Sequence, residues 1–324
     1  MSNFIGRNVS VGFGADSPRG TVAVPTYWVP FDTYTVMDVE EKALDDDAYG
    51  RIETTFGADL TYQWAQGAFT GTLHDQSEGL FLKSVFGSYA GATHTGETTV
   101  KDHTFTVGNN ATHPALTIAS IDGNENVASP NGMISKYEVD YALGKYVSRT
   151  CDFMAAKSAT ASNTAALTVE NKFRTQDVTL KVATTTAGLA GATAIKVKNA
   201  KITIEQGLSR EHVLGQLGIV DIFNTTWKSS ASFELLYNDL TFKNYVFNNT
   251  ALAMSLSLTR SDITIGTASN PTLTFTFQPG YFTKWNKNVQ KDNLVSQTSD
   301  YMGVYSIANA GQCTATLTNT VPTY

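Results

Sequence analysis

Charged residues and cysteines are both scarce in this chain of 324 residues. Asp, Glu, Lys and Arg make up 16% of the sequence, against roughly 25% in typical soluble domains. The net charge of −6 argues against a nucleic-acid-binding surface, which is ordinarily basic. The two cysteines, Cys151 and Cys313, exclude a disulfide framework, and nothing around them resembles a metal knuckle. Free, buried thiols in a protein made in a reducing compartment are the simplest interpretation.

Long apolar runs are missing as well. No stretch approaches the roughly 20 apolar residues that cross a bilayer as a helix. The first seven residues, Met1–Arg7, lack the basic and apolar regions of a secretory signal. We therefore expect neither a membrane span nor secretion.

Threonine and alternating strand patterns are abundant. The chain has 45 threonines and 11% aromatic residues, a composition that suits half-buried, pleated surfaces. Polar and apolar residues alternate with period two in several segments, each of which predicts a strand with one buried face. These segments are 136–141, 177–182, 201–205, 272–277 and 314–318. Helical spacing occurs only in 77–86 and 239–247, two short helices that each need a sheet to pack against.

An internal repeat divides the sequence. The clearest match is between 147–154 and 295–302, which share the pattern V-S-x-T-x-D-[FY]-M. Four weaker matches keep the same order: 9–11 with 178–180, 48–51 with 213–216, Trp64 with Trp227, and 113–118 with 270–275. We interpret the chain as two tandem β-rich units, 1–165 and 166–324, joined by the small, polar segment 158–165. The alternative is one large β domain with recurrent Thr-rich strands.

Catalytic and metal-binding motifs are not evident. The five histidines form no H-E-x-x-H pattern, and the sequence has no phosphate-binding loop, calcium loop or G-x-S-x-G elbow. His94 and His103 flank a loop that also holds Glu97 and Asp102, so this loop is either a surface metal site or simply solvated. We predict no cofactor and no enzymatic activity.

Two long connections between expected strands, 40–54 and 206–217, are the most informative feature. Connections of this length are unusual inside a compact domain, and both hold apolar residues among charged ones. They are either ordinary mobile loops or protruding arms that bury those side chains against a neighbouring subunit, and we favour the arms because both units keep one. The candidate contact residues are Leu44, Asp45, Asp46, Asp47, Tyr49, Arg51, Ile52, Leu208, Arg210, Glu211, Leu214 and Leu217.

An ordered set of short motifs resembles the tail tube proteins of long-tailed bacteriophages. The set covers nearly the whole chain and comprises Ile5–Gly14, Ser17–Thr21, Pro25–Trp28, Tyr62–Gly67, Gly71–Asp75, Lys101–Val107, His113–Thr117, Tyr141–Val147 and Thr316–Val321. The resemblance implies a mainly β fold in which each unit is a β-sandwich or half-barrel with one flanking helix and a long inter-strand arm.

The resemblance also implies a function and partners. Such proteins form stacked rings in the virion tail, around a lumen through which DNA passes during ejection. Family members with a duplicated fold form trimers that imitate a hexamer, so a trimer is our first expectation and a hexamer the second. Expected partners are further copies of the chain, a tape-measure protein and tail terminator or tip proteins. Synthesis and assembly in the host cytoplasm follow from the same resemblance.

A DNA conduit should not bind its cargo, because a basic lining would trap the duplex by counterion release. We therefore propose Asp38, Glu40, Thr203 and Glu205 as lumen-facing candidates, on the polar faces of the strands before the arms. The alternative is that they are ordinary solvent-facing residues. A competing hypothesis is a carbohydrate-binding or adhesin module that uses Trp28 or Trp285 as a stacking platform.

Overall fold

The chain folds as a mainly β protein, and the computed structural model describes residues 5–324. The secretory-signal expectation, which concerned Met1–Arg7, therefore lies partly outside the described residues. The helices are α1 (Glu78–Phe86) and α2 (Thr241–Phe247). The strands are β1 (Ser10–Ala15), β2 (Tyr27–Val29), β3 (Thr33–Asp45), β4 (Gly57–Thr72), β5 (Gly87–Thr93), β6 (Lys101–Val107), β7 (Leu116–Ile121), β8 (Asn126–Ala142), β9 (Ser148–Ala155), β10 (Ala159–Thr160), β11 (Val178–Ala183), β12 (Val197–Glu211), β13 (Asp221–Leu236), β14 (Ala251–Thr259), β15 (Thr272–Asn288), β16 (Ser296–Met302) and β17 (Cys313–Asn319).

Every strand predicted from the alternating segments is present, and both predicted helices form. Helix α1 begins after Ser77 and ends at Gly87, whose positive φ of 82° suits a residue without a side chain. Both cysteines are buried and free, as expected. Among residues 5–324, no helix has the length and apolar character needed to cross a membrane.

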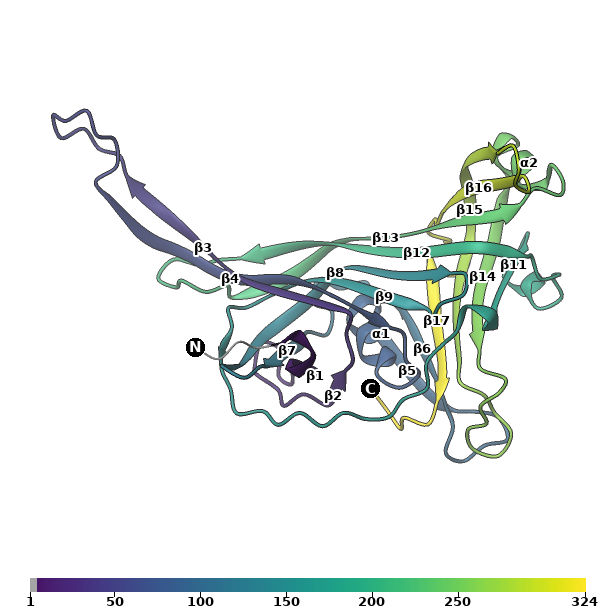
Figure 1. Ribbon diagram of the computed structural model, residues 1–324, viewed down its shortest axis with the longest axis horizontal. Helices are drawn as coiled ribbons and strands as arrows, with labels where there is room; N and C mark the ends of the chain where they lie inside the picture. Colours follow the sequence, from purple (N-terminus) through teal and green to yellow (C-terminus); the bar gives the residue numbers. More distant parts are fainter. Residues whose placement is uncertain (1–4) are drawn as a thin grey trace.

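Eight strands form one long antiparallel sheet, which we call the main sheet. Its order is β3-β4-β9-β8-β12-β13-β16-β15. Figure 1 shows this sheet running across the molecule, with α1 beneath it and the β3–β4 hairpin extending far beyond the rest. The side chains of Phe69 in β4 and Phe81 in α1 stack at a centroid distance of 6.0 Å, which joins helix to sheet.

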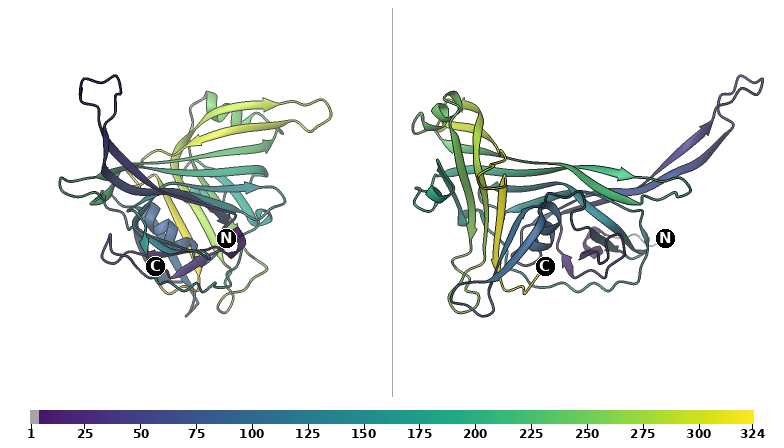
Figure 2. Two further views of the ribbon diagram at one scale, coloured as in Figure 1. Left: turned by 60° about the vertical axis from the view of Figure 1, so that its left-hand side comes forward. Right: turned by 180° about the vertical axis from the view of Figure 1, so that it is seen from behind.

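Two strands leave the main sheet part-way along and build a second layer. The first part of β8 pairs with β7 and β10, and β7 pairs with β1. Similarly, the first part of β15 pairs with β14 and β17, and β14 pairs with β11. In the rear view of Figure 2 the strands around β14 and β17 stand steeply against the main sheet. The core lies between the two layers.

The same five strand pairings occur twice in the same chain order. The pairings β1–β7, β7–β8, β8–β9, β9–β4 and β4–β3 correspond to β11–β14, β14–β15, β15–β16, β16–β13 and β13–β12. The irregularities correspond too. Thr61 and Thr225 each form the extra residue of a bulge and donate a 2.9 Å hydrogen bond to the facing strand, at Glu41 O and Gly207 O.

A second pair of bulges repeats this pattern. Ser135 in β8 donates to the carbonyl of Asp152, and Thr283 in β15 donates to the carbonyl of Asp300. Both pairs are separated by 148 residues, which is the spacing of the V-S-x-T-x-D-[FY]-M match. Identical bulges at corresponding places fix the alignment of the two halves residue by residue.

This alignment corrects two of the sequence matches. In this alignment the residue equivalent to Trp64 is Lys228, and Trp227 is one residue away from it. It also separates 113–118, which leads into β7, from 270–275, which leads into β15, because β7 corresponds to β14. The matches 9–11 with 178–180 and 147–154 with 295–302 do fall on corresponding strands.

The two halves are interlocked rather than merely consecutive. The segment after β10 packs on the first half: Asn171 and Asp75 exchange backbone and side-chain hydrogen bonds, and Phe173 N donates to Leu73 O. At the other end of the chain, β17 pairs with β6, and Lys83 in α1 donates to Tyr324 O at 2.6 Å. A boundary at residue 165 stays a prediction, with residues 170–173 held by the first half.

Candidate functional site: two hairpin arms and a polar sheet face

The first arm is a β-hairpin, not the irregular connection that we expected. Residues 40–45 belong to β3, and the tip covers only residues 46–56. The charged sequence hides this strand because neither of its faces is covered, so burial imposes no alternation on it. The outer part of the hairpin projects from the body of the chain (Figure 1).

Large apolar side chains at the tip of the first arm are exposed. Ile52 is 98% exposed, Leu44 58% and Tyr49 57%. The Tyr49 ring packs on Phe56 at 4.5 Å, and its hydroxyl donates to Asp45 at 3.2 Å. The remaining candidates at this tip, Asp46, Asp47 and Arg51, are also exposed. The tip is therefore locally ordered, while Ile52 and more than half of the surface of Leu44 and Tyr49 stay exposed in the described part of the chain.

The second arm is the β12–β13 hairpin, and its outer part is docked on the first arm. The Arg210 guanidinium lies 3.8 Å from the centroid of the Trp64 ring, and the ring of His212 lies 4.3 Å from that of Tyr62. The backbone N–H of Gln63 donates to Leu217 O at 2.8 Å. Of the other candidates, Leu214 is fully exposed, Glu211 is exposed and Leu208 is half-buried.

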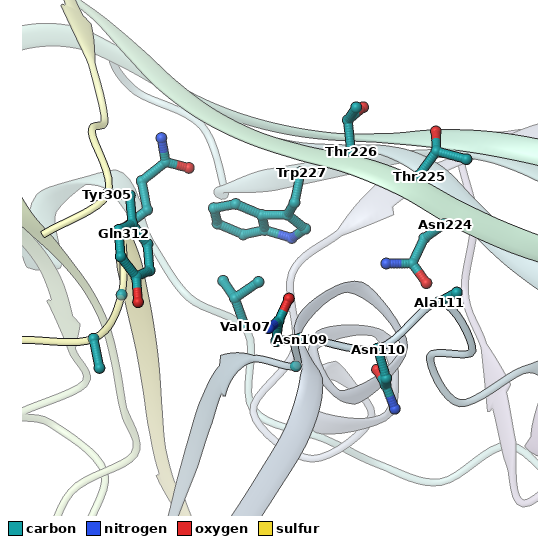
Figure 3. A pocket seen from close by; sticks show the side chains of 13 residues that line it. Val107, Asn109, Asn110, Ala111, Asn224, Thr225, Thr226, Trp227, Tyr305 and Gln312 are labelled. Carbon is teal, nitrogen blue, oxygen red and sulfur yellow. The ribbon is translucent and has the colours of Figure 1, made fainter. Parts of the chain in front are cut away.

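A groove lies in the second half of the chain, at the place on β13 that corresponds to this docking site on β4. Residues 224–227 of β13 correspond to 60–63 of β4, and they line a groove of about 530 Å³. Figure 3 shows Trp227 in this groove facing Val107 and Asn109, with Tyr305 and Gln312 on the far side. The indole N–H of Trp227 donates to Val85 O at 3.1 Å, which fixes the ring.

The main sheet has one face toward the helices and one polar face. Cross-strand partners share a face, so Ile204, Tyr137 and Cys151 all point toward the helices. Thr203 and Glu205, by contrast, lie on the polar face with their partners Glu138 and Lys136.

The four lumen candidates do not lie on one face. Asp38 faces Ala65 and Glu40 faces Gln63, so both point to the helix side. Asp38 accepts hydrogen bonds from the backbone and hydroxyl of Ser158, and Glu40 from Lys157 at 3.3 Å. Our grouping of Asp38 and Glu40 with Thr203 and Glu205 is wrong, because a misalignment of one residue exchanges the two faces of a strand.

Charges of both signs alternate on the polar face. Glu138 accepts hydrogen bonds or ion pairs from Lys136 at 3.0 Å, Thr203 at 3.3 Å and Lys201 at 3.5 Å. Partial burial works in the opposite direction, but these partners hold the pKa of Glu138 below its ordinary value. The charged residues on this face include Glu41, Lys136, Glu138, Asp140, Asp152, Lys201, Glu205, Lys228, Glu234, Lys284 and Asp300. Acidic groups outnumber basic ones, and the basic ones are interspersed among them.

A buried ionic cluster supports the sheet from the helix side, and our sequence reasoning missed it. Arg149 in β9 donates to Glu78 in α1, which also accepts from the Tyr137 hydroxyl at 2.6 Å. Burial raises the pKa of Glu78 despite these two partners. The sequence did hold a sign of this cluster, because Arg149 lies on the buried face of β9 together with Cys151 and Phe153.

The loop that held the possible metal ligands is tied into the fold. His94 and Asp102 are paired at 2.9 Å, and His103 is buried. Glu97 accepts from the backbone N–H groups of Thr267 and Ala268. In the described part of the chain no cluster of three or more His, Cys, Asp or Glu side chains could hold a metal ion.

The tryptophans named for carbohydrate stacking are not free platforms. Trp28 is only 3% exposed. Trp285 is half-buried: its indole donates to Gln297 at 2.8 Å, and Lys243 lies over its ring.

Comparison with known protein families assigns the chain to a family. A family model described as phage tail tube protein matches residues 6–302, which is nearly the whole chain. No curated protein matches the chain significantly.

Proposed function

The chain belongs to the phage tail tube protein family, and from this premise we propose that it polymerises as stacked rings that enclose the DNA conduit. It is a structural protein of the virion tail, and its family implies self-assembly into a tube. The observation that carries the finer proposal is the main sheet, which has a polar face and a helix-covered face, and whose outer strands β3 and β15 each leave one edge unpaired within residues 5–324.

We propose further that the chain is a tandem duplication of one tube-fold unit. The support is the repeated order of five strand pairings together with bulges at corresponding residues, Thr61 with Thr225 and Ser135 with Thr283. Each unit supplies four strands to the main sheet, one flanking helix and one hairpin arm. The proposed units are residues 1–165 and residues 166–324.

Ring composition follows from the duplication. If a ring needs six equivalent units, three chains supply them, so a trimer is our first proposal and a hexamer of chains the second. Three chains would close a continuous ring of strands and cover the free edges of β3 and β15, which would otherwise template aggregation.

The polar face of the main sheet is our proposed lumen lining. Thr203 and Glu205 lie on it, whereas Asp38 and Glu40 point the other way. Its lysines are paired or flanked by carboxylates, so a passing duplex would find few free cations and release few counterions. DNA is thus proposed as cargo that does not adhere.

The hairpin arms are our proposed contacts between subunits. Inside the chain the second arm docks on β4 around Gln63. The equivalent contact between chains would bring the first arm of a neighbour onto β13, at the groove beside Trp227. The exposed Ile52 and Tyr49 would then be covered. Tape-measure and terminator or tip proteins are the further partners we propose, with synthesis and assembly in the host cytoplasm.

Electron microscopy and sedimentation of the purified protein test the proposal. We expect hollow tubes of uniform diameter in micrographs, and labelling of virion tails by an antibody against the chain. A chain that stays monomeric at high concentration and is absent from purified tails would rule the proposal out.

A further inference from the structure

The two outer strands of the main sheet, β3 and β15, each have an edge without a partner strand among residues 5–324. β3 has a single partner, β4, among residues 5–324, and residues 284–288 of β15 pair only with β16. No pairing joins β3 to β15 within residues 5–324, so the sheet stays open at both edges. Each edge therefore presents free N–H and C=O groups.

The pairing of β12 with β8 inside the chain, which we call the internal junction, shows how two such edges can pair. β12 pairs with β8 over seven residue pairs, from Asn199 with Ala142 to Glu205 with Lys136. The repeated bulges align β12 with β3 at a spacing of 166 residues and β8 with β15 at a spacing of 148. The β12–β8 junction is thus a template for joining β3 to β15.

We propose that β3 of one chain pairs antiparallel with β15 of a second copy, in the register of the β12–β8 junction. Transferred residue by residue, that register sets Met37 opposite Asn286, Val36 opposite Lys287 and Asp38 opposite Trp285. This inference rests on the proposed tube assembly and names the residues through which neighbouring chains join.

Burial at the corresponding positions supports the register. Val36 is 38% exposed, but its counterpart at the internal junction, Ile202, is fully buried. Likewise Val289 is 66% exposed and its counterpart Tyr141 only 3%. The two free edges thus expose apolar side chains at positions that the internal junction covers.

The charges of the two edges are complementary. β3 and its flank carry five carboxylates, Asp32, Asp38, Glu40, Glu41 and Asp45, against one cation, Lys42. The end of β15 and the residues after it carry three cations, Lys284, Lys287 and Lys291, against one carboxylate, Asp292. In the proposed register Asp38 lies diagonally from Lys287 on the helix side, within reach of a long side chain. The like charges of two β3 strands also disfavour pairing of β3 with a second β3.

Cysteine pairs test the register in assembled tubes. Direct cross-strand partners have Cβ atoms about 4.5–5.5 Å apart and diagonal ones about 7–8 Å, whereas a disulfide needs about 3.5–4.5 Å. The native thiols are buried and stay in place. On oxidation, M37C/N286C should give chain-to-chain disulfides at least tenfold faster than the shifted control M37C/N288C, and M37C alone should give none.

The outcomes separate this inference from the proposed function. Tubes in which the shifted pair links as fast, or in which neither pair links, would overturn the register while leaving the tube intact. A wild-type chain that forms no tubes would overturn both. Should the variants fail to assemble, hydrogen exchange on wild-type tubes decides: Thr33–Val39 and Lys284–Asn288 must become protected on assembly, and unchanged exchange there contradicts the pairing.

Discussion

Arg149 and Glu78 form an ion pair in which neither side chain reaches solvent. The pair joins β9 to α1, and the Arg149 guanidinium also lies 4.1 Å from the centroid of the Phe81 ring. The main sheet and the helix that supports it are therefore held together by a charge pair inside an aromatic cluster.

Removing one partner of this pair should be costly. Arg149→Ala leaves the Glu78 carboxylate buried without its cation, and such changes destabilise by about 3–5 kcal/mol. Urea unfolding of the unassembled chain measures this loss. Lys157→Ala is the control: Lys157 pairs with Glu40 at the surface, so its removal should change stability by less than about 1 kcal/mol. Equal effects of the two variants would refute this role for Arg149.

His74 should make stability depend on pH between about 6.5 and 4. Burial, Arg149 and Lys172 lower the pKa of His74 from 6.5 to about 4 in the folded chain. The unfolded chain therefore takes up a proton first as the pH falls, and the stability that is present above pH 6.5 is lost progressively down to about pH 4. The free energy of unfolding that His74 contributes in this way is at most about 3 kcal/mol. In urea titrations across this range His74→Gln should lose less stability than the wild type, and parallel curves would contradict the assignment.

Period-two alternation predicted the strands well, since it is imposed wherever one face is buried. It failed at residues 40–45 because both faces of β3 are exposed there in a single chain. Without a buried face, polar and apolar residues need not alternate along a strand. The faces of Asp38 and Glu40 were wrong for a different reason. Asp38 and Glu40 were matched with Thr203 and Glu205 at a spacing of 165 residues, which is the spacing of the match between 48–51 and 213–216, whereas the bulges align β3 with β12 at 166. A shift of one residue exchanges the two faces of a strand.

The long-range pairings could not be predicted from sequence at all. Nothing in residues 101–107 or 313–319 indicates that β6 and β17 pair across the two halves. Arg149, on the other hand, was predictable, because a charged residue in the buried phase of a strand requires a buried partner.

The exposed tips of the arms should matter for assembly and not for folding. Ile52→Asp and Leu214→Asp alter side chains that are 98% and 100% exposed, so the stability of the unassembled chain should change by no more than about 0.5 kcal/mol. Sedimentation should nevertheless show a loss of tubes. Val169→Asp, at a residue 95% exposed outside the arms, is the matched control and should assemble. If both arm variants form normal tubes, the proposal that the arms contact neighbouring subunits is contradicted.

A charge reversal on the polar sheet face should make the tube adhere to DNA. Glu205→Lys places a cation on that face between Lys136 and Lys228, so tubes of this variant should retain duplex DNA at low salt and release it as salt rises. Glu40→Lys makes the same charge change on the helix side and should not retain DNA. Co-sedimentation of a labelled duplex measures both. Equal retention by the two variants would contradict the lumen assignment.

The number of chains in one ring tests the central claim most directly. An averaged end-on image of the assembled tube should show three chains per ring, with six similar densities around the lumen from two units in each chain. A ring with six chains, or one whose two halves occupy unrelated positions around the axis, would contradict the account of the chain as a duplicated tube unit.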